Sequence, residues 1–244
     1  MVKPAEIPMV SVVQALVNVL REQILSGEVI QGNSLRENEL CAAFNVSRHT
    51  VRSAVQALSY ERLVRHEPNR GAFVAKVTEQ DVKEIFRIRT LLELEAVRSI
   101  TGNSTALSLV REAFAKLRDL PNDVYWGEIR DADLGFHQAL IAGLGSARIN
   151  DIFGGLRAEL RLCFLQMQAE LSDKATIVQE HREILQQLES GNAKKAVELM
   201  RYHLESGYQM ICKGMDSRQT PLVVTTSGKL NPGAARQTSA SNER

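Results

Sequence analysis

The side chains best suited to metal chemistry in this sequence are an aspartate and three histidines in its second half. Asp133 precedes His137 by four residues, so the two side chains share one face if that segment is helical. A carboxylate and a neutral imidazole at this spacing can bind one divalent ion, and His181 and His203 could complete the shell from facing helices. Such ligands suit zinc, nickel, iron or manganese. Taken singly, each histidine is better explained as a surface residue or a hydrogen-bonded core residue, and spacing does not show that the four groups converge.

Positive charge gathers in a second group of residues nearer the N-terminus. From Arg48 to Lys76 there are six cations and two anions, which leaves +4 on the segment, although the whole chain carries only +1. Contacts with phosphates depend on this local field rather than on the net charge of the chain. The segment therefore suits a nucleic-acid backbone, and a solvated charged surface is the alternative explanation.

A helix-turn-helix pattern carries the first part of this charge. We predict helices over residues 37–44 and 48–61, the second beginning after a serine N-cap. Apolar residues of the second helix recur at three- and four-residue intervals and form one buried stripe: Val51, Ala54, Val55 and Leu58. Arg48, His49 and Arg52 therefore point outward near its N-terminus, which is the end that meets base edges in helix-turn-helix proteins.

A short hairpin is predicted to follow the second helix. Residues 63–64 and 72–74 are apolar and flank the polar segment 65–71, which contains a proline and an asparagine suited to a turn. Arg70 and Gly71 lie at the basic tip of this hairpin. Together with the two helices, the hairpin would form a winged unit that binds DNA.

The rest of the chain is predicted to be almost wholly helical. A helix from Ser11 to Ser26 completes the core of the winged unit, and later segments repeat the helical pattern over residues 79–100, 105–120, 125–143, 146–171, 173–190 and 193–212. We therefore predict a mainly α fold in three parts. Residues 1–76 form a winged helix-turn-helix DNA-binding domain with a small β-hairpin wing, residues 77–213 an all-helical bundle, and residues 214–244 a flexible tail.

Composition indicates the class of protein and its compartment. No apolar run approaches the roughly 20 residues of a membrane-spanning helix, and the first ten residues lack the layout of a signal peptide. Cys41, Cys163 and Cys212 are scattered, which suggests reduced thiols. We therefore predict a cytoplasmic protein with no membrane partner.

Resemblance to a known family extends these expectations. The N-terminal segment resembles the winged helix-turn-helix of the GntR family of bacterial transcriptional regulators in three stretches: residues 35–40, 44–52 and 68–74. The remainder resembles the helical FCD effector domain of the FadR subfamily through Arg89 with Glu93, residues 133–137, residues 180–181 and His203. Together these stretches span roughly residues 10 to 213.

The resemblance implies roles for individual residues. An acid and three histidines in this order ligate a metal inside the family's helical bundle, so the implied ligands are Asp133, His137, His181 and His203. Zinc is the first choice of metal, with nickel, manganese or iron as alternatives. Contacts to base edges or phosphates are expected from Arg48, His49, Thr50 and Arg52, and an approach to the minor groove from Arg70 and Gly71.

The expected effector is a small carboxylate that takes an open position on the metal. Arg89 would be its bidentate partner, and Arg161 is a second candidate on spacing alone. The alternative for Arg89 is an ion pair with Glu93, four residues along the same helix.

The sequence departs from the family pattern at three places. His49 and Thr50 stand where the family usually has Thr-Pro, and Arg36 occupies the usual N-cap of the first reader helix. Arg62 replaces a glycine that commonly ends the second helix, so a left-handed turn is less favourable there. These changes bear on which operator sequence is bound.

We therefore expect a ligand-responsive transcriptional regulator, in the family's commoner role of repressor. It would bind a pseudo-palindromic DNA operator as a homodimer and respond to a small organic acid. One alternative is a constitutive DNA-binding regulator whose metal is purely structural. The other is a metal-dependent enzyme; that alternative leaves the DNA-reading segment unexplained, and we expect no enzymatic activity.

Overall fold

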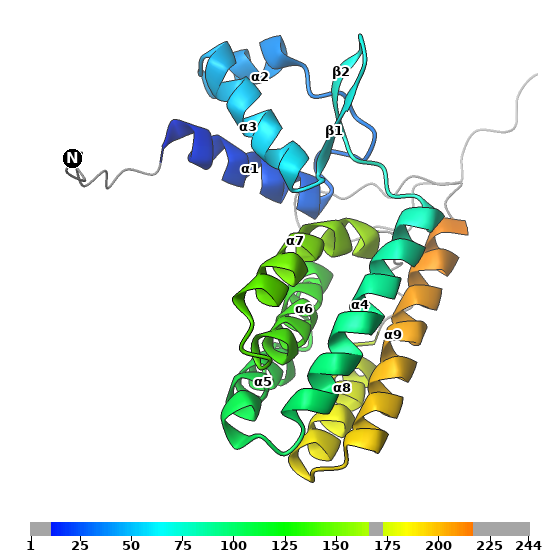
Figure 1. Cartoon of the computed structure of the whole chain (residues 1–244). Helices are drawn as coiled ribbons and strands as arrows, with labels where there is room; N and C mark the ends of the chain where they lie inside the picture. Colours follow the sequence, from blue (N-terminus) through cyan, green and yellow to red (C-terminus); the bar gives the residue numbers. More distant parts are fainter. Residues whose placement is uncertain (1–10, 166–172, 217–244) are drawn as a thin grey trace, which may run out of the picture.

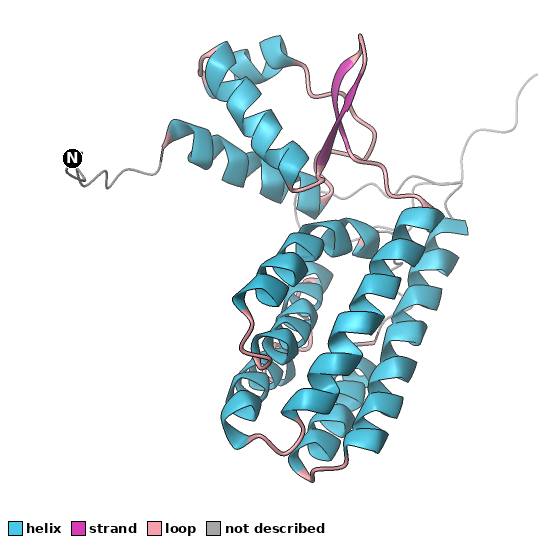
Figure 2. Cartoon of the chain, in the orientation of Figure 1, coloured by secondary structure: helices cyan, strands magenta, loops and turns pink. Residues whose placement is uncertain are grey.

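The computed structural model describes residues 11–165 and 173–216 and shows a small head resting on a helical bundle (Figure 1). Helices dominate both parts, and the strands of the described residues form one two-stranded sheet at the edge of the head (Figure 2). The predicted mainly α fold with a β-hairpin is therefore confirmed. None of the helices in the described ranges combines the length and apolar character needed to cross a bilayer.

The head is built from helices α1 (Val12–Ser26), α2 (Glu37–Phe44) and α3 (Arg48–Tyr60), with strands β1 (Val64–Glu67) and β2 (Gly71–Val74). Ser11 and Ser47 cap α1 and α3, because each side chain accepts a hydrogen bond from the backbone N–H three residues on. The strands pair antiparallel with Val64 opposite Val74. Both valines are buried in the same core as the apolar stripe of α3.

The bundle contains α4 (Glu79–Ile100), α5 (Ser104–Arg118), α6 (Trp126–Ala142), α7 (Ala147–Phe164), α8 (Lys174–Glu189) and α9 (Ala193–Asp216). Thr78 and Asp81 form a reciprocal capping box that starts α4. The long helices α4 and α9 pack side by side along the bundle (Figure 1). Phe136 and Phe153 are among the large side chains fully buried at its centre.

Helix α7 is shared between the two parts. Leu160 and Phe164 belong to the core of the bundle, whereas Leu162 is buried in the core of the head, with Ala158 and Leu165 packed against it. The three head-facing residues recur at four- and three-residue intervals, so they form one face of the helix. The head core is therefore completed by a side chain from the bundle.

The turn between α3 and β1 is left-handed although it contains no glycine. Arg62 has a φ of 58°, a conformation that costs about 1–2 kcal/mol for a residue with a side chain. Its backbone N–H donates to the carbonyl of Ser59, and its guanidinium lies 3.6 Å from Glu159 in α7. The left-handed turn that the resemblance implied is therefore present, with an arginine in place of the glycine.

The helices begin and end close to their predicted bounds, with two differences. Helix α9 continues to Asp216, beyond the predicted end at residue 212, and so includes the first residues of the predicted tail. Helix α7 ends at Phe164, and Leu165 is its C-cap. The remainder of the predicted α7, from residue 166, lies outside the described residues, as does the predicted tail from residue 217.

Candidate functional site

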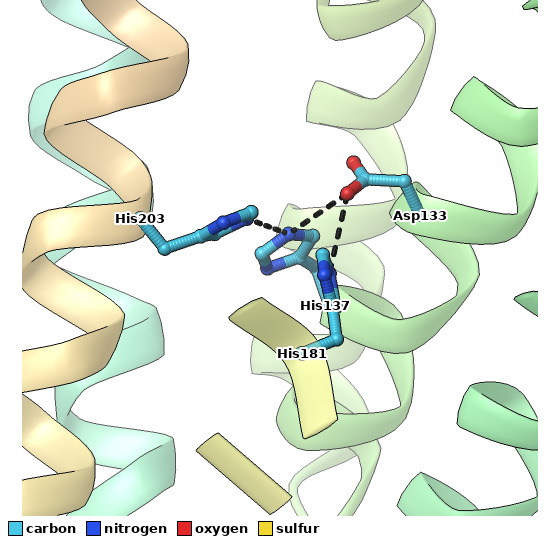
Figure 3. Close-up of side chains that lie close together, drawn as sticks. All are labelled: Asp133, His137, His181 and His203. Carbon is cyan, nitrogen blue, oxygen red and sulfur yellow. Dashed lines mark hydrogen bonds and ion pairs between the residues drawn. The ribbon is translucent and has the colours of Figure 1, made fainter. Parts of the chain in front are cut away.

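Asp133, His137, His181 and His203 come together in the middle of the bundle (Figure 3). Helix α6 supplies the first two, one turn apart, while α8 supplies His181 and α9 supplies His203. The four side chains point toward one another, and one candidate ligand atom from each lies within 4.8 Å of the others. The fold therefore brings together all four residues that the family resemblance implied as metal ligands.

The separations between these atoms suit a single small metal ion. The Nε2 atoms of His137 and His203 are 3.2 Å apart. Asp133 Oδ1 lies 3.2 Å from His181 Nε2 and 3.8 Å from His137 Nε2. Two ligands about 2.1 Å from one ion are about 3.0 Å apart at a right angle and about 3.4 Å apart in a tetrahedron. With Nδ1 of His181 donating to a backbone carbonyl, its Nε2 and Asp133 Oδ1 are both acceptors, so their 3.2 Å approach is not a hydrogen bond and Nε2 is buried without a donor among the described residues. A metal ion would explain this, so the residues fit the ion.

The outer nitrogen of each histidine is held by a separate partner. His137 Nδ1 lies 2.5 Å from Glu93 Oε2, and His203 Nδ1 lies 2.7 Å from Glu180 Oε2. His181 Nδ1 lies 2.8 Å from the backbone carbonyl oxygen four residues earlier. Such partners fix the orientation of a ligating ring and raise its basicity. Each Nε2 is consequently left for the centre of the cluster.

Charges around the cluster keep its carboxyl groups ionised. Burial alone would raise the pKa of Glu93, but Arg89 and then His137 outweigh burial and hold that pKa at about 2. Burial also disfavours the charged form of Asp133, yet the neighbouring histidines hold its pKa well below the usual range. Burial and then a neighbouring histidine lower the pKa of His203 to about 4, so this ring is neutral at pH 7. Burial would lower the pKa of His137, but the two carboxylates outweigh burial and raise that pKa, so they favour positive charge beside them. Two buried carboxylates beside the neutral ring of His203 suit a divalent cation.

A cavity of about 40 Å³ lies beside the cluster and is lined by Asp133, His203 and Arg89. Arg89 is 2% exposed, and its Nε donates to Glu93 Oε1 at 2.7 Å. Its buried Nη2 has no hydrogen-bond partner among the described residues. The ion pair with Glu93 is therefore present, and one edge of the guanidinium stays unused. A buried N–H left unpaired is costly, and an anion in the cavity would satisfy it.

Two further cavity residues, Trp126 and Arg130, were missed by the sequence analysis. They precede Asp133 and His137 on α6 at intervals of four, three and four residues, so all four side chains form one stripe. Arg130 is buried, and the indole N–H of Trp126 is a buried donor with no partner in the described part of the chain. The helical spacing before Asp133 could have identified both residues.

Arg161 lies outside this cavity, at the junction between the head and the bundle. Its Nη2 donates to Asp131 Oδ2 at 3.0 Å and to Glu22 Oε2 at 3.3 Å. Asp131 belongs to α6 and Glu22 to α1, so Arg161 connects three helices. This position does not support the expected role in lining an effector pocket, because the side chain is on the face of α7 that meets the head.

Four of the residues expected to read DNA lie in the first turns of α3. Arg48 and His49 are exposed in the first turn. The hydroxyl of Thr50 is 2.9 Å from that of Ser47, so it takes part in the cap. Arg52 Nε donates to both carboxylate oxygens of the half-buried Glu37 at the start of α2, at 2.9 and 3.0 Å.

A groove of about 720 Å³ between α3 and the hairpin brings Arg52 together with Arg70 and Gly71. Gln56 and Tyr60 line the same groove. They follow Arg52 at intervals of four residues, so the three side chains share the outer face of α3. Sequence analysis did not single out these two residues, although the same spacing indicates them. The groove gives the helix and the hairpin tip one continuous polar surface.

Two known families match the sequence, one over each part of the chain. The family described as FCD domain matches residues 84–206, and the family described as bacterial regulatory proteins, gntR family, matches residues 13–74. Among curated relatives, the gluconate operon transcriptional repressor of Bacillus licheniformis is 29% identical over 159 residues. That match covers 64% of this chain and 65% of the relative.

Solved structures give the same result. A protein assigned as a GntR transcriptional regulator from Rhodococcus sp. RHA1 is 32% identical, with a TM-score of 0.66 over 82% of this chain and 97% of that chain. McbR/YncC of E. coli is 19% identical and shares the fold, with a TM-score of 0.67 over 85% of this chain and 100% of that chain. The head and the bundle thus occur together in other proteins.

Proposed function

Because this chain belongs to the GntR family of bacterial regulatory proteins and carries an FCD domain, we propose that it is a metal-dependent transcriptional repressor that a small organic acid controls. Family membership makes it a DNA-binding transcriptional regulator; the acid, the metal and the FadR subfamily are our proposal. One observation carries the proposal. A single cavity is lined by two candidate metal ligands and by Arg89, whose buried Nη2 has no hydrogen-bond partner among the described residues.

We assign the reading of DNA to α3 and the hairpin. Arg48 is exposed, and we assign it a contact with O6 and N7 of a guanine. Arg52 is held by Glu37 and must exchange that carboxylate for a base or a phosphate. His49 and Thr50 would add contacts at the same helix end, while Arg70 and Gly71 would approach the minor groove.

We propose that the regulator acts as a homodimer in the cytoplasm. A single head of this size offers few base contacts, and two-fold symmetry would place two recognition helices on a pseudo-palindromic operator. The operator half-sites are then expected about 34–36 Å apart, or at a multiple of that distance.

We propose zinc as the bound metal, with nickel, manganese or iron as alternatives. When bound, the ion would offer an open coordination position to a carboxylate oxygen. Arg89 would hold the second oxygen of that carboxylate through its unused Nη2. The cavity of about 40 Å³ has room for a few water molecules, so the acid is small or opens the cavity further.

The proposal is tested with the zinc-loaded full-length protein. DNA sites are first selected from a random double-stranded library at moderate salt. Acids are then screened for a rise in unfolding temperature, with and without chelator, and for a change in affinity for the selected DNA. Gluconate belongs in this panel because the B. licheniformis relative is a gluconate operon repressor.

A repressor that senses an acid should show stabilisation that disappears when the metal is removed, together with weaker DNA binding. A selected site with no response to any acid would instead support a constitutive regulator with a structural metal. Failure to enrich any sequence from the library would refute the DNA-reading assignment.

A further inference from the structure

Resting on the proposed effector function, we propose that Arg130 couples an acid bound in the cavity to the position of the head. Arg130 lines the cavity, and its guanidinium donates a hydrogen bond to the main chain of α1, which belongs to the head. An anion that engages Arg130 would therefore withdraw it from the head.

The contacts of Arg130 place it between the two parts. Its Nη1 donates to the carbonyl oxygen of Leu25 at 3.3 Å, and its Nε donates to Asp131 Oδ1 at 3.1 Å. The residue is 5% exposed. On α6 it precedes the proposed metal ligand Asp133 by three residues and so shares its face.

The hydrogen bond to Leu25 places a positive charge at the C-terminal end of α1. Leu25 lies in the last turn of α1, where backbone carbonyls lack partners within the helix and carry partial negative charge. The last turn of α1 contains no basic residue of its own. Arg130 therefore supplies, from the bundle, the cation that this helix end lacks.

An acid in the cavity would compete with the Leu25 carbonyl for this cation. A carboxylate pairs with a guanidinium through two short, charge-assisted bonds, which are stronger than one bond of 3.3 Å to a neutral carbonyl. Arg89, on helix α4, lines the same cavity, has a buried Nη2 with no hydrogen-bond partner among the described residues, and favours the same ligand charge. The acid would consequently be held between two arginines, and α1 would lose one of its attachments.

The head would loosen without separating from the bundle. Arg161 still bridges Glu22 to Asp131 outside the cavity, and Leu162 still fills the head core. A more mobile head loses more conformational entropy when two recognition helices are placed on one operator, and this loss weakens binding. The acid is therefore expected to weaken operator binding.

Hydrogen exchange of residues 23–31, at the end of α1, measures this coupling directly. Zinc-loaded full-length wild type is compared with Arg130→Gln and Arg161→Gln, without ligand and with acetate, lactate, malonate or gluconate at equal concentration. Without acid, both variants should exchange roughly tenfold faster than wild type in this segment, the order expected for losing a hydrogen bond to a charged group.

The two variants are expected to respond differently to the acid. An acid that raises the unfolding temperature of wild type should also speed exchange at residues 23–31 and weaken DNA binding. Arg161→Gln should keep both responses, while Arg130→Gln should lose both. Arg130→Lys, which retains the buried cation, is measured alongside as a second variant and should keep slower exchange than Arg130→Gln.

The outcomes distinguish this inference from the proposed function. Exchange at residues 23–31 that is equal in wild type and both Arg130 variants would overturn the inference, as would an acid response retained in Arg130→Gln. An acid that stabilises wild type without changing exchange there would leave the sensor intact and refute the coupling. If no acid stabilises the zinc-loaded wild type, the proposed function fails and the inference falls with it.

Discussion

Two of the candidate metal ligands in the bundle are each hydrogen-bonded to a glutamate on the side away from the metal position. Glu93 and Glu180 hold the outer nitrogens of His137 and His203, so each ring is oriented before any ion is bound. Glu93 also neutralises the buried Arg89. A substitution behind the ligands is therefore expected to affect metal affinity almost as strongly as one among them.

Replacing a ligand should remove the metal without unfolding the head. His181→Ala is expected to lower zinc affinity by at least about tenfold, because one of four ligand atoms is lost. Elemental analysis after dialysis against limiting zinc measures the change. His66→Ala, on the exposed face of β1, is the matched control and should keep full occupancy. Full zinc content in His181→Ala would disprove the shared site.

Replacing the carboxylate behind a ligand should cost both metal and stability. In Glu93→Gln, zinc affinity is expected to fall about 10–100-fold because His137 loses its orienting anion. The free energy of unfolding without metal should fall by about 3–5 kcal/mol, since Arg89 is left buried without its counter-charge. A zinc-competition titration and urea unfolding measure the two effects. Glu95→Gln, at an exposed position on the same helix, is the control. Equal zinc affinity and equal unfolding free energy in the two variants would contradict the role given to Glu93.

At the scale of the elements, α3 presents two arginines that differ in their surroundings. Arg48→Ala is expected to weaken operator binding by about 1–3 kcal/mol if Arg48 pairs with a base. Arg52→Ala should cost less, because binding by Arg52 first breaks its ion pair with Glu37. Gel shifts on the selected operator measure both, with exposed Arg201→Ala in α9 as the control. Wild-type affinity in both variants would remove α3 from the DNA contact.

Elements were easier to predict from the sequence than the contacts between them. The spacing of apolar residues predicted α3 and its buried stripe, and the turn residues before Gly71 predicted the hairpin. Both patterns are local in the sequence. The convergence of His137 with His181 and His203 depends on how three helices pack, so spacing alone left it open and only the family resemblance implied it. Arg161 was assigned to the effector pocket because the sequence does not show which face of α7 meets the head.

The molecule as a whole is held together by a junction that crosses the predicted domain boundary at residue 76. Gln31 donates its side-chain amide to the carbonyl of Leu162 at 3.0 Å and accepts from the backbone N–H of Val77 at 3.1 Å. Arg130 and Arg161 add polar contacts from the bundle to α1. The head is therefore expected to depend on the bundle for part of its stability.

Two leucines on α7, two residues apart, test this dependence because they face opposite cores. Leu162 is buried in the head core and Leu160 in the bundle core. Each substitution to alanine should lower the free energy of unfolding by about 2–5 kcal/mol, since a similar apolar volume is lost. Hydrogen exchange should nevertheless separate them: Leu162→Ala should speed exchange in α1 and α3, and Leu160→Ala in α4 and α6. Leu162→Ala should also weaken operator binding, although its side chain lies in α7, because it loosens the core that supports α3. Faster exchange confined to the bundle in Leu162→Ala would show that the head is stable without it.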